Sequence, residues 1–498
     1  MNGIPSKTVR AELTEFVGGG AAAIRAGWET IWPIRTAILT ALHIVSASAV
    51  SVHVLLRKRD IGAAVGWIGL GWLSPFLGAG LYLMFGINRV RRRAHGLRSD
   101  LPPMPAPAEQ TAGIKRGDNF AALERAALWI SRRPATIGNS VMLLQNGDEA
   151  YPRMIAAIDA AQTSILLSSY ILRDDAAGAP FIDALVRART RGVEARVLLD
   201  GIGSGYFRSP GYSQLRRNGV PAARFMHSPK PWLMPFLNLR SHKKVVVADG
   251  RLAFIGGLNI GAENLLAGHP RHPVRDVHFE LHGPVVGQLV ADFARDWLFT
   301  TGETLEGSAW FPELKNTGNC VARVVTSGPD RDVDKIELLA LTAITCARTS
   351  VRIMSPYFLP DDRLVSALAL AAMRGVEVDI LIPERSNHRF VDLATRPNIE
   401  PMIRAGCRIW LNPPPFEHSK LMVVDNAWAM IGSANWDMRS FRLNFEVNLE
   451  IFDVELAQTL ERRMLDKRLC ALTLDELVAT PLPARLRNAG LRLLLPYL

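Results

Sequence analysis

Two histidines in this sequence are each followed by a lysine two positions later and by an aspartate five positions after that lysine. The first set is His242, Lys244 and Asp249, and the second set is His418, Lys420 and Asp425. In both sets a glycine follows the aspartate by seven positions and an asparagine follows it by ten. Residues at i and i+2 of a strand share one face, so each set is expected to present an imidazole beside an ammonium group.

This pair of motifs suits chemistry on a phosphodiester. One imidazole can attack phosphorus while the other protonates the departing alkoxide. Lys244 and Lys420 would place positive charge on the phosphate oxygens, and Asn259 and Asn435 would add neutral hydrogen-bond donors. Such a reaction requires neither a metal nor a cofactor, and we predict none. One histidine–lysine pair alone would indicate a surface strand, whereas two complete copies predict a site.

The chain around these motifs repeats itself. Residues 163–170 (TSILLSSY) are echoed by residues 349–357 (TSVRIMSPY), and residues 191–199 (RGVEARVLL) by residues 374–382 (RGVEVDILI). Helix-like stretches followed by apolar, β-branched runs are typical of β-α-β units with a buried sheet. We therefore predict an α/β fold with a duplicated domain, whose two pseudo-twofold related lobes bring both histidines to one cleft.

An apolar region precedes this repeat. Residues 36–56 carry no formal charge, and residues 61–88 form a second uncharged run, which predicts a hairpin of two transmembrane helices. The alternative is a buried hairpin in a soluble protein. Basic residues at 89–98 predict that the following chain stays in the cytoplasm and the turn at residues 57–60 outside. The three cations of that turn oppose this placement, and a hairpin that only dips into the bilayer would remove the conflict.

The predicted organisation has five parts. They are a membrane anchor at residues 1–98, a proline-rich linker at 99–117, a first lobe at 118–318, a second lobe at 319–470 and a basic, apolar tail at 471–498. The tail would lie on a membrane surface or pack as a helix on the second lobe. The first lobe also holds an apolar insert at 231–237, expected to be either a buried loop or a segment that dips into the bilayer.

The paired motifs resemble those of the phospholipase D superfamily. The stretch 432–446 (GSANWDMRSFRLNFE) is similar to the signature of the bacterial-type cardiolipin synthases. Gly256 to Pro284 in the first lobe fits the same family, although Ser241 and Val274 replace its usual asparagine and tryptophan. The hairpin also carries residues that fit this family, namely Trp67, Pro75, Gly78, Tyr82, Phe85 and Gly86.

This resemblance implies roles for individual side chains. His242 would form a phosphatidyl-histidine intermediate, and His418 would act as general acid and then as base. Family members orient each imidazole with a downstream carboxylate, which implies Asp276 for His242 and Glu446 for His418. The predicted catalytic set comprises all residues of both motifs, namely His242, Lys244, Asp249, His418, Lys420 and Asp425. Within this set, the two aspartates are expected mainly to tie strand to loop.

The resemblance also implies a reaction and a location. The expected enzyme is a phosphatidyltransferase of the cell (inner) membrane that joins two phosphatidylglycerol molecules into cardiolipin and releases glycerol, with its catalytic part in the cytoplasm. The chain lacks the D-x-x-D-G signature of transferases that use a cytidine-activated lipid. A phospholipase D that uses water, a nuclease and a non-enzymatic lipid-binding scaffold are the alternatives.

The distribution of charge along the chain indicates whether its anionic partner is a lipid or a nucleic acid. Residues 1–100 carry a net charge of +7 and residues 481–498 a net charge of +3, which leaves +1 of the total +11 for residues 101–480. A nuclease would be expected to carry a basic stripe across its catalytic body. Charge beside the apolar runs and in the tail instead favours an anionic bilayer, and no nucleic-acid partner is expected.

Overall fold

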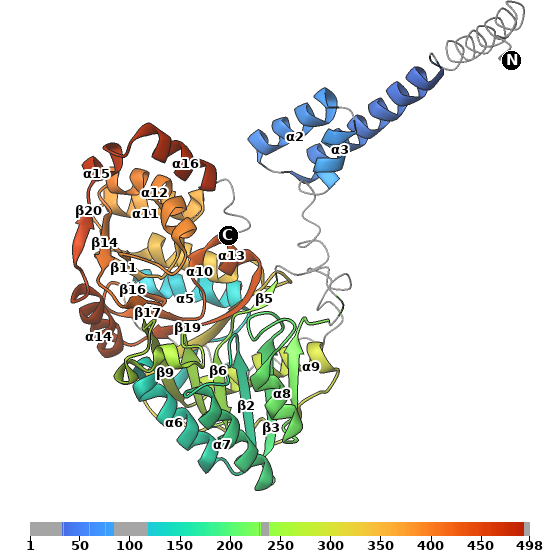
Figure 1. The fold of residues 1–498 in the computed structure, drawn as a ribbon. Helices are drawn as coiled ribbons and strands as arrows, with labels where there is room; N and C mark the ends of the chain where they lie inside the picture. The colour runs from blue at the N-terminus through green and yellow to red at the C-terminus, as the bar shows by residue number, and fades with distance from the viewer. Residues whose placement is uncertain are drawn as a thin grey trace, which may run out of the picture. The chain divides into compact units, whose positions relative to one another are not determined.

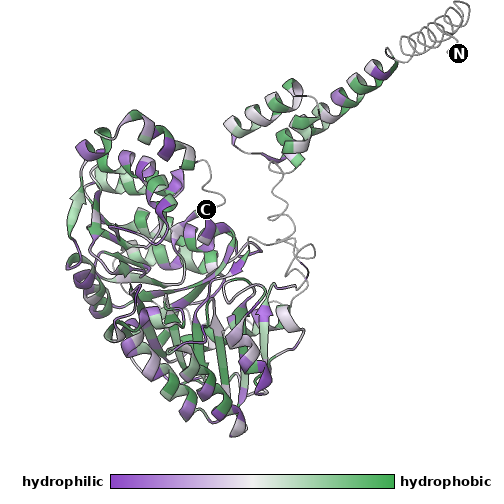
Figure 2. Ribbon diagram, in the orientation of Figure 1, coloured by the Kyte–Doolittle hydropathy of each residue, from purple (hydrophilic) through white to green (hydrophobic). Residues whose placement is uncertain are grey.

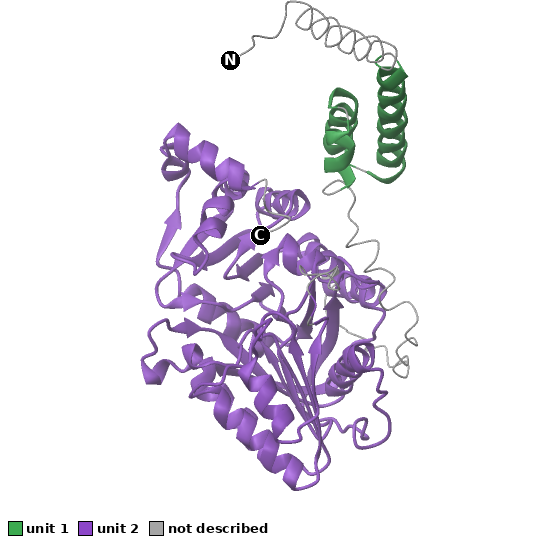
Figure 3. Ribbon diagram, turned by 45° about the vertical axis from the view of Figure 1, so that its right-hand side comes forward, with its two compact units in different colours: residues 1–92 green, residues 93–498 purple. Residues whose placement is uncertain are grey.

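The chain forms two compact units, residues 1–92 and residues 93–498, coloured separately in Figure 3. The computed structural model describes residues 32, 34–58, 60–74, 76–83, 118–228, 230 and 239–492. The predicted linker at 99–117 and the apolar insert at 231–237 lie outside the described residues.

The first unit begins with one long apolar helix. The Ile34–Arg57 helix has 24 residues and contains an 18-residue window with a mean hydropathy of 1.8, so it is long and apolar enough to cross a bilayer. Asp60 starts the next helix, α2 (Ile61–Leu73), because its carboxylate accepts the Ala63 N–H at 2.5 Å. α2 lies beside the first helix, and the Trp72 indole donates to the hydroxyl of Ser51 at 3.0 Å.

The second apolar run does not form the predicted spanning helix. α2 has only 13 residues, about 20 Å of helix, and the short α3 (Leu77–Leu81) follows it. Gly78 packs so closely that a Cβ there would lie 2.1 Å from the carbonyl oxygen of Leu70. Tyr82 then comes within 2.6 Å of the His53 imidazole, which lies near the end of the first helix. The chain therefore folds back after α2, and the described residues contain one helix long enough to span a bilayer where the sequence predicts two.

The second unit is built on one continuous mixed sheet (Figure 1). The strand order is β20-β14-β13-β11-β16-β17-β19-β10-β1-β9-β7-β6-β2-β3-β4. Read outward from the antiparallel β1–β10 pair, the first seven strands on each side match one another, which confirms the predicted duplication. The strands of the first lobe are β1 (Thr136–Gln145), β2 (Ser164–Ser169), β3 (Glu194–Asp200), β4 (Ala222–Phe225), β6 (Val245–Ala248), β7 (Leu252–Gly256) and β9 (Val277–His282). Those of the second lobe are β10 (Cys320–Ser327), β11 (Ser350–Met354), β13 (Glu377–Pro383), β14 (Arg408–Asn412), β16 (Leu421–Val424), β17 (Trp428–Gly432), β19 (Asn444–Phe452) and β20 (Cys470–Leu472).

Helices cover the sheet, which explains why β6 and β16 are apolar and buried along their whole length (Figure 2). On the first lobe they are α6 (Asn146–Ala160), α7 (Gly178–Thr190) and α8 (Pro210–Arg217); on the second they are α10 (Lys335–Cys346), α11 (Asp362–Met373) and α12 (Arg389–Arg404). A third core joins α9 (Val285–Thr301) and α14 (Val454–Leu465) to both halves of the sheet.

One helix lies outside the lobe that the predicted boundaries give it, and the tail is helical. α5 (Asp118–Ser131) falls in the predicted first lobe, yet its apolar side chains join the core of the second lobe. The tail forms α15 (Leu474–Val478) and α16 (Leu482–Arg492), and Leu491 of α16 packs beside Val391 of α12. Of the two arrangements expected for the tail, the structure therefore contains the helix packed on the second lobe.

Two short strand pairs also connect the two lobes. β5 (Arg240–Ser241) pairs in parallel with β19, and β15 (Phe416–Glu417) pairs in parallel with β8 (Val274–Arg275). Each of these pairs joins the residues before one motif histidine to a strand of the opposite lobe. The remaining short elements are β12 (Phe358–Leu359), β18 (Trp436–Asp437), α13 (Met438–Arg442) and the 3₁₀ turns η3 (Ala262–Asn264) and η4 (Leu266–Gly268).

Candidate active site

Both motif histidines open onto one cavity between the lobes. The cavity has a volume of about 500 Å³, and His242 and His418 line it together with Asn259 and Asn435. Among the described residues, neither asparagine carboxamide makes a hydrogen bond, and both carboxamide oxygens are buried. These two amides thus keep their hydrogen-bonding capacity for a ligand. The sequence reasoning expected all four side chains in one cleft, and the fold brings them together.

Each imidazole is held by a carboxylate from the other lobe. The Nδ1 atom of His242 lies 3.1 Å from Oε2 of Glu446, and Nδ1 of His418 lies 2.7 Å from Oδ2 of Asp276. Both carboxylates are fully buried. The two residues do contact the imidazoles, but the expected pairing of Asp276 with His242 and of Glu446 with His418 is wrong, because the partners are exchanged.

Strand pairing between the lobes explains this exchange. Ser241 is in register with Phe445 of β19, and the backbone N–H of His242 donates to the Phe445 carbonyl at 2.9 Å. The next residue along β19 is Glu446. In the other half, the N–H of His418 donates to the carbonyl of the residue just before Asp276 at 2.7 Å. Each histidine is therefore fixed beside the carboxylate of the strand that its own segment joins.

The hydrogen bonds at Nδ1 determine which ring nitrogen can react. A charged carboxylate holds a proton on Nδ1, which leaves Nε2 with its lone pair. Burial lowers the pKa of His418 to about 4, helped by the nearby Lys420 ammonium and opposed by Asp276. Burial also lowers the pKa of His242, against the charge of Glu446. Both imidazoles are accordingly neutral near pH 7.

The two lysines lie against the backbone and rings of the same cluster. Nζ of Lys244 donates to the carbonyl of His242 at 2.5 Å and lies 5.4 Å from the centre of the Tyr170 ring. Nζ of Lys420 donates to the His418 carbonyl and lies 3.9 Å from Asp276. Burial lowers the pKa of Lys244 to about 7 and that of Lys420 to about 8. Bound anions would restore their full charge.

The residue between histidine and lysine faces the opposite side of the first motif, as strand alternation predicts. Lys243 extends toward α9, where its ammonium contacts Asp292 at 2.7 Å and Asp296 at 2.8 Å. This buried ion pair anchors the motif segment to the helix below the sheet. It takes no part in the cavity.

The motif aspartates lie at the far ends of their strands. Asp249 accepts the N–H groups of Gln162, Thr163 and Ser164, at 2.7 to 3.0 Å. Asp425 accepts the equivalent N–H groups of residues 348–350 in the second lobe. Neither aspartate lines the cavity, so their place in the predicted catalytic set is corrected. They tie strand to loop, which is the role expected for them within that set.

The cavity also contains residues that the sequence reasoning did not select. The Tyr170 ring meets the His242 ring edge-on at 5.1 Å, and Tyr357 meets His418 similarly at 6.3 Å. Both tyrosines end the echoed segments of the repeat, so their matching positions were a usable signal. Further lining residues include Arg240, Asp437 and Arg439. Burial raises the pKa of Asp437 to about 6.

Two facing lobes with paired histidine–lysine motifs define a phospholipase D-like protein. The family described as "Cardiolipin synthase, PLD-like domain" matches residues 154–297 and 340–468. A cardiolipin synthase A of Pseudomonas putida is 35% identical over 86% of this chain and 90% of its own length. The cardiolipin synthase of Geobacillus kaustophilus is 30% identical over 98% of this chain and 99% of its own.

The chain therefore belongs to the cardiolipin synthase family. It is an enzyme of the phosphatidyltransferase type, and its long apolar helix marks it as membrane-associated. The fold is also similar to that of a phosphatidylserine synthase from Haemophilus influenzae, with a TM-score of 0.57 and 16% identity over 76% of this chain and the whole of that one. The predicted family, fold class and enzyme type are confirmed.

Proposed function

We propose that this enzyme transfers a phosphatidyl group from one phosphatidylglycerol to a hydroxyl of a second, giving cardiolipin and free glycerol. The observation that carries the proposal is the pair of histidines on one cavity, each with Nδ1 held by a buried carboxylate of the opposite lobe. That geometry leaves two Nε2 atoms for one phosphorus. The exchange of one phosphodiester for another needs no nucleotide.

In the first step, Nε2 of His242 attacks phosphorus and the bond from phosphorus to the glycerol oxygen breaks. The proton on Nε2 of His418 passes to that oxygen. The low pKa of His418 is compatible with this role, because an anionic phosphodiester beside Nε2 favours the imidazolium form. Glu446 stabilises the positive charge that develops on the His242 ring.

In the second step, the acceptor lipid supplies the nucleophile. Neutral His418 takes the proton from its hydroxyl, the oxygen attacks phosphorus, and the bond from phosphorus to Nε2 of His242 breaks. Lys244 and Lys420, whose buried ammonium groups bond to the carbonyls of His242 and His418, would stabilise charge on the phosphate oxygens together with the cavity-lining amides of Asn259 and Asn435. The enzyme returns to its starting protonation state.

Full-length protein in vesicles of phosphatidylglycerol tests this proposal. Cardiolipin and glycerol in equal amounts are expected, and both should disappear in the His242→Ala variant. Phosphatidic acid as the sole lipid product would instead identify a hydrolase, and the absence of turnover would identify a scaffold. Degradation of DNA that is also lost in His242→Ala would favour a nuclease. A phospho-histidine trapped in acid-free conditions and mapped to residue 242 would identify the nucleophile.

We also propose that the catalytic unit is cytoplasmic and that the chain crosses the inner membrane once. Within the second apolar run, the chain after α2 turns back, because Gly78 packs against Leu70 of α2 and Tyr82 contacts His53 of the first helix. Both of its described ends are then near the turn at 57–60. A single crossing keeps the cations of that turn, together with those at 89–98, on the cytoplasmic side, in accordance with the positive-inside rule.

Cysteine labelling in spheroplasts distinguishes one crossing from two. We expect Asn2→Cys to react with a membrane-impermeant maleimide from outside, whereas Lys58→Cys should react only after lysis. Cys470, which is exposed on the catalytic unit, serves as the internal cytoplasmic marker. Labelling of Lys58→Cys in intact spheroplasts would contradict the single crossing and support two.

A further inference from the structure

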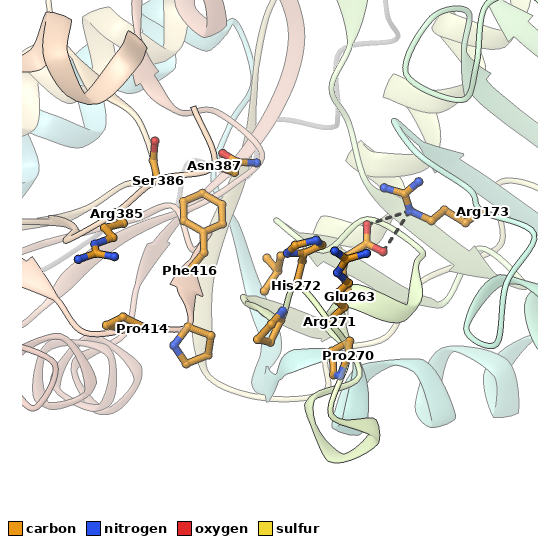
Figure 4. A pocket seen from close by; sticks show the side chains of 13 residues that line it. Arg173, Glu263, Pro270, Arg271, His272, Arg385, Ser386, Asn387, Pro414 and Phe416 are labelled. Atoms are coloured by element: carbon orange, nitrogen blue, oxygen red, sulfur yellow. Dashed lines mark hydrogen bonds and ion pairs between the residues drawn. The ribbon is translucent and has the colours of Figure 1, made fainter. Parts of the chain in front are cut away.

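A second, larger cavity lies between the lobes, beside the catalytic one. Its volume is about 880 Å³, and its lining comes from both lobes (Figure 4). The first lobe contributes Arg173, Glu263, Pro270, Arg271, His272, Pro273 and Val274; the second contributes Arg385, Ser386, Asn387, Pro414, Pro415 and Phe416. We call this cavity the arginine pocket.

The arginine pocket is positively charged. Arg173 is neutralised, since its Nε lies 3.1 Å from both carboxylate oxygens of Glu263. In the part of the chain that the structure describes, Arg271 and Arg385 make neither an ion pair nor a hydrogen bond with their guanidinium groups, and they stand on opposite lobes (Figure 4). Two unneutralised and exposed guanidinium groups on opposite walls of one cavity favour an anion with several oxygens, such as a phosphate.

The arginine pocket adjoins the catalytic cavity on the His418 side. Asn387 lines both cavities, and Phe416 lines the pocket while its ring lies 5.8 Å from that of His418. Val274, in the pocket wall, belongs to the β8–β15 pair that positions His418 against Asp276. His242 and its surroundings contribute nothing to the described lining. The pocket therefore lies next to the surroundings of His418, the group that would activate the acceptor hydroxyl.

We infer that the arginine pocket binds the phosphate of the acceptor phospholipid. The inference rests on the proposed function, in which the acceptor is itself a phosphodiester. Its attacking hydroxyl must reach His418, and one glycerol unit separates that hydroxyl from the acceptor's own phosphate. Arg271 and Arg385 would hold that phosphate while the donor phosphate occupies the catalytic cavity. No bond changes in the arginine pocket, and after transfer it holds one of the two phosphates of the product.

This arrangement gives the enzyme a way to prefer a lipid acceptor to water. Water and small neutral alcohols can reach the intermediate but gain nothing from the two arginines. An anionic lipid acceptor is held beside His418 and gains the effective concentration that binding provides. The arginine pocket would thus control the ratio of transfer to hydrolysis without acting on the first chemical step.

The test compares two acceptors in the same protein. In full-length Arg271→Gln/Arg385→Gln, cardiolipin formation at limiting phosphatidylglycerol should fall by about 10- to 100-fold, the usual value of lost charge-assisted contacts. Transfer of the phosphatidyl group to ethanol should stay close to that of the wild type. Arg217→Gln, which changes an exposed arginine of α8, is the control and should change neither reaction. Equal losses with both acceptors, or no loss with either, would overturn the inference.

A binding measurement keeps the inference separate from the proposed function. In the His242→Asn background, which cannot form the intermediate, soluble dihexanoyl phosphatidylglycerol should bind at two sites per protein. Adding Arg271→Gln/Arg385→Gln should leave one. One binding site in His242→Asn, or two sites after the arginine substitutions are added, would contradict the proposed role of the arginine pocket. A wild-type enzyme that transfers to ethanol but never makes cardiolipin would instead refute the proposed function.

Discussion

Glu446 stands on the second lobe and holds the imidazole of His242, which belongs to the first. The two residues are 204 positions apart in the chain, yet Oε2 and Nδ1 are 3.1 Å apart. The same exchange joins Asp276 of the first lobe to His418 of the second at 2.7 Å. Neither lobe alone therefore contains a complete histidine–carboxylate pair, and the two lobes must assemble before either histidine is oriented.

The exchange predicts which histidine each carboxylate controls. Glu446→Gln should lower the pKa of His242 further, because the charge that supports its imidazolium form is lost, and should leave that of His418 nearly unchanged. Asp276→Asn should do the reverse. Both variants should lose at least about 100-fold in activity. The pH dependence of diethyl pyrocarbonate modification, read for each histidine by peptide mass spectrometry, measures the two pKa values. A shift of the His418 pKa in Glu446→Gln would instead support the pairing of Glu446 with His418 within the second lobe.

The motif aspartates should affect stability more than catalysis. Asp249→Asn and Asp425→Asn each replace a carboxylate by a neutral amide. Each change weakens hydrogen bonds from three backbone N–H groups and from a threonine hydroxyl. Each change is expected to cost about 1–3 kcal/mol of unfolding free energy, with little effect on turnover per folded molecule. Thermal unfolding and activity normalised to folded protein separate the two effects. A stable variant with a large loss of turnover would return these aspartates to the catalytic set.

The lysines predict the alkaline side of the pH profile. The pKa values of about 7 for Lys244 and about 8 for Lys420 lie below the ~10.5 of a free lysine. As pH rises through this window, the ammonium groups lose their protons and the attraction for phosphate weakens. We expect kcat/KM to fall with an apparent pKa near 7 to 8. In Lys244→Arg the guanidinium stays charged, so the fall should move to higher pH at a lower maximal rate. A wild-type profile that is flat to about pH 10 would be inconsistent with this origin.

Tyr170 should act through its ring. The ring contacts His242 edge-on and faces the Lys244 ammonium at 5.4 Å. Tyr170→Phe keeps both contacts and should retain most of the activity, whereas Tyr170→Leu should lose about tenfold, since a cation–π contact of this kind is worth about 0.5–2 kcal/mol. Initial rates on phosphatidylglycerol vesicles compare the two variants. A larger loss in the phenylalanine variant would instead assign the role to the hydroxyl.

Much of the fold could be predicted from local patterns. The echoed segments ending at Tyr170 and Tyr357 predicted the duplication, and apolar, β-branched runs predicted the buried strands. α5 could not be assigned by pattern, because its apolar stripe would suit either lobe and only packing against α10 selects the second. The second apolar run looked like a spanning helix by length. Hydropathy does not predict the contacts of Gly78 and Tyr82 at which the chain turns back.

The sequence by itself determined the chemistry of the site. The spacing of His242 and Lys244, repeated at His418 and Lys420, places like groups on one strand face, since a strand has a period of two. Only the tertiary structure decided which carboxylate serves which imidazole. Those relations depend on the pairing of β5 with β19 and of β15 with β8, between segments far apart in the chain. Local spacing specifies which way a side chain points on its own strand, but not which distant strand will lie beside it.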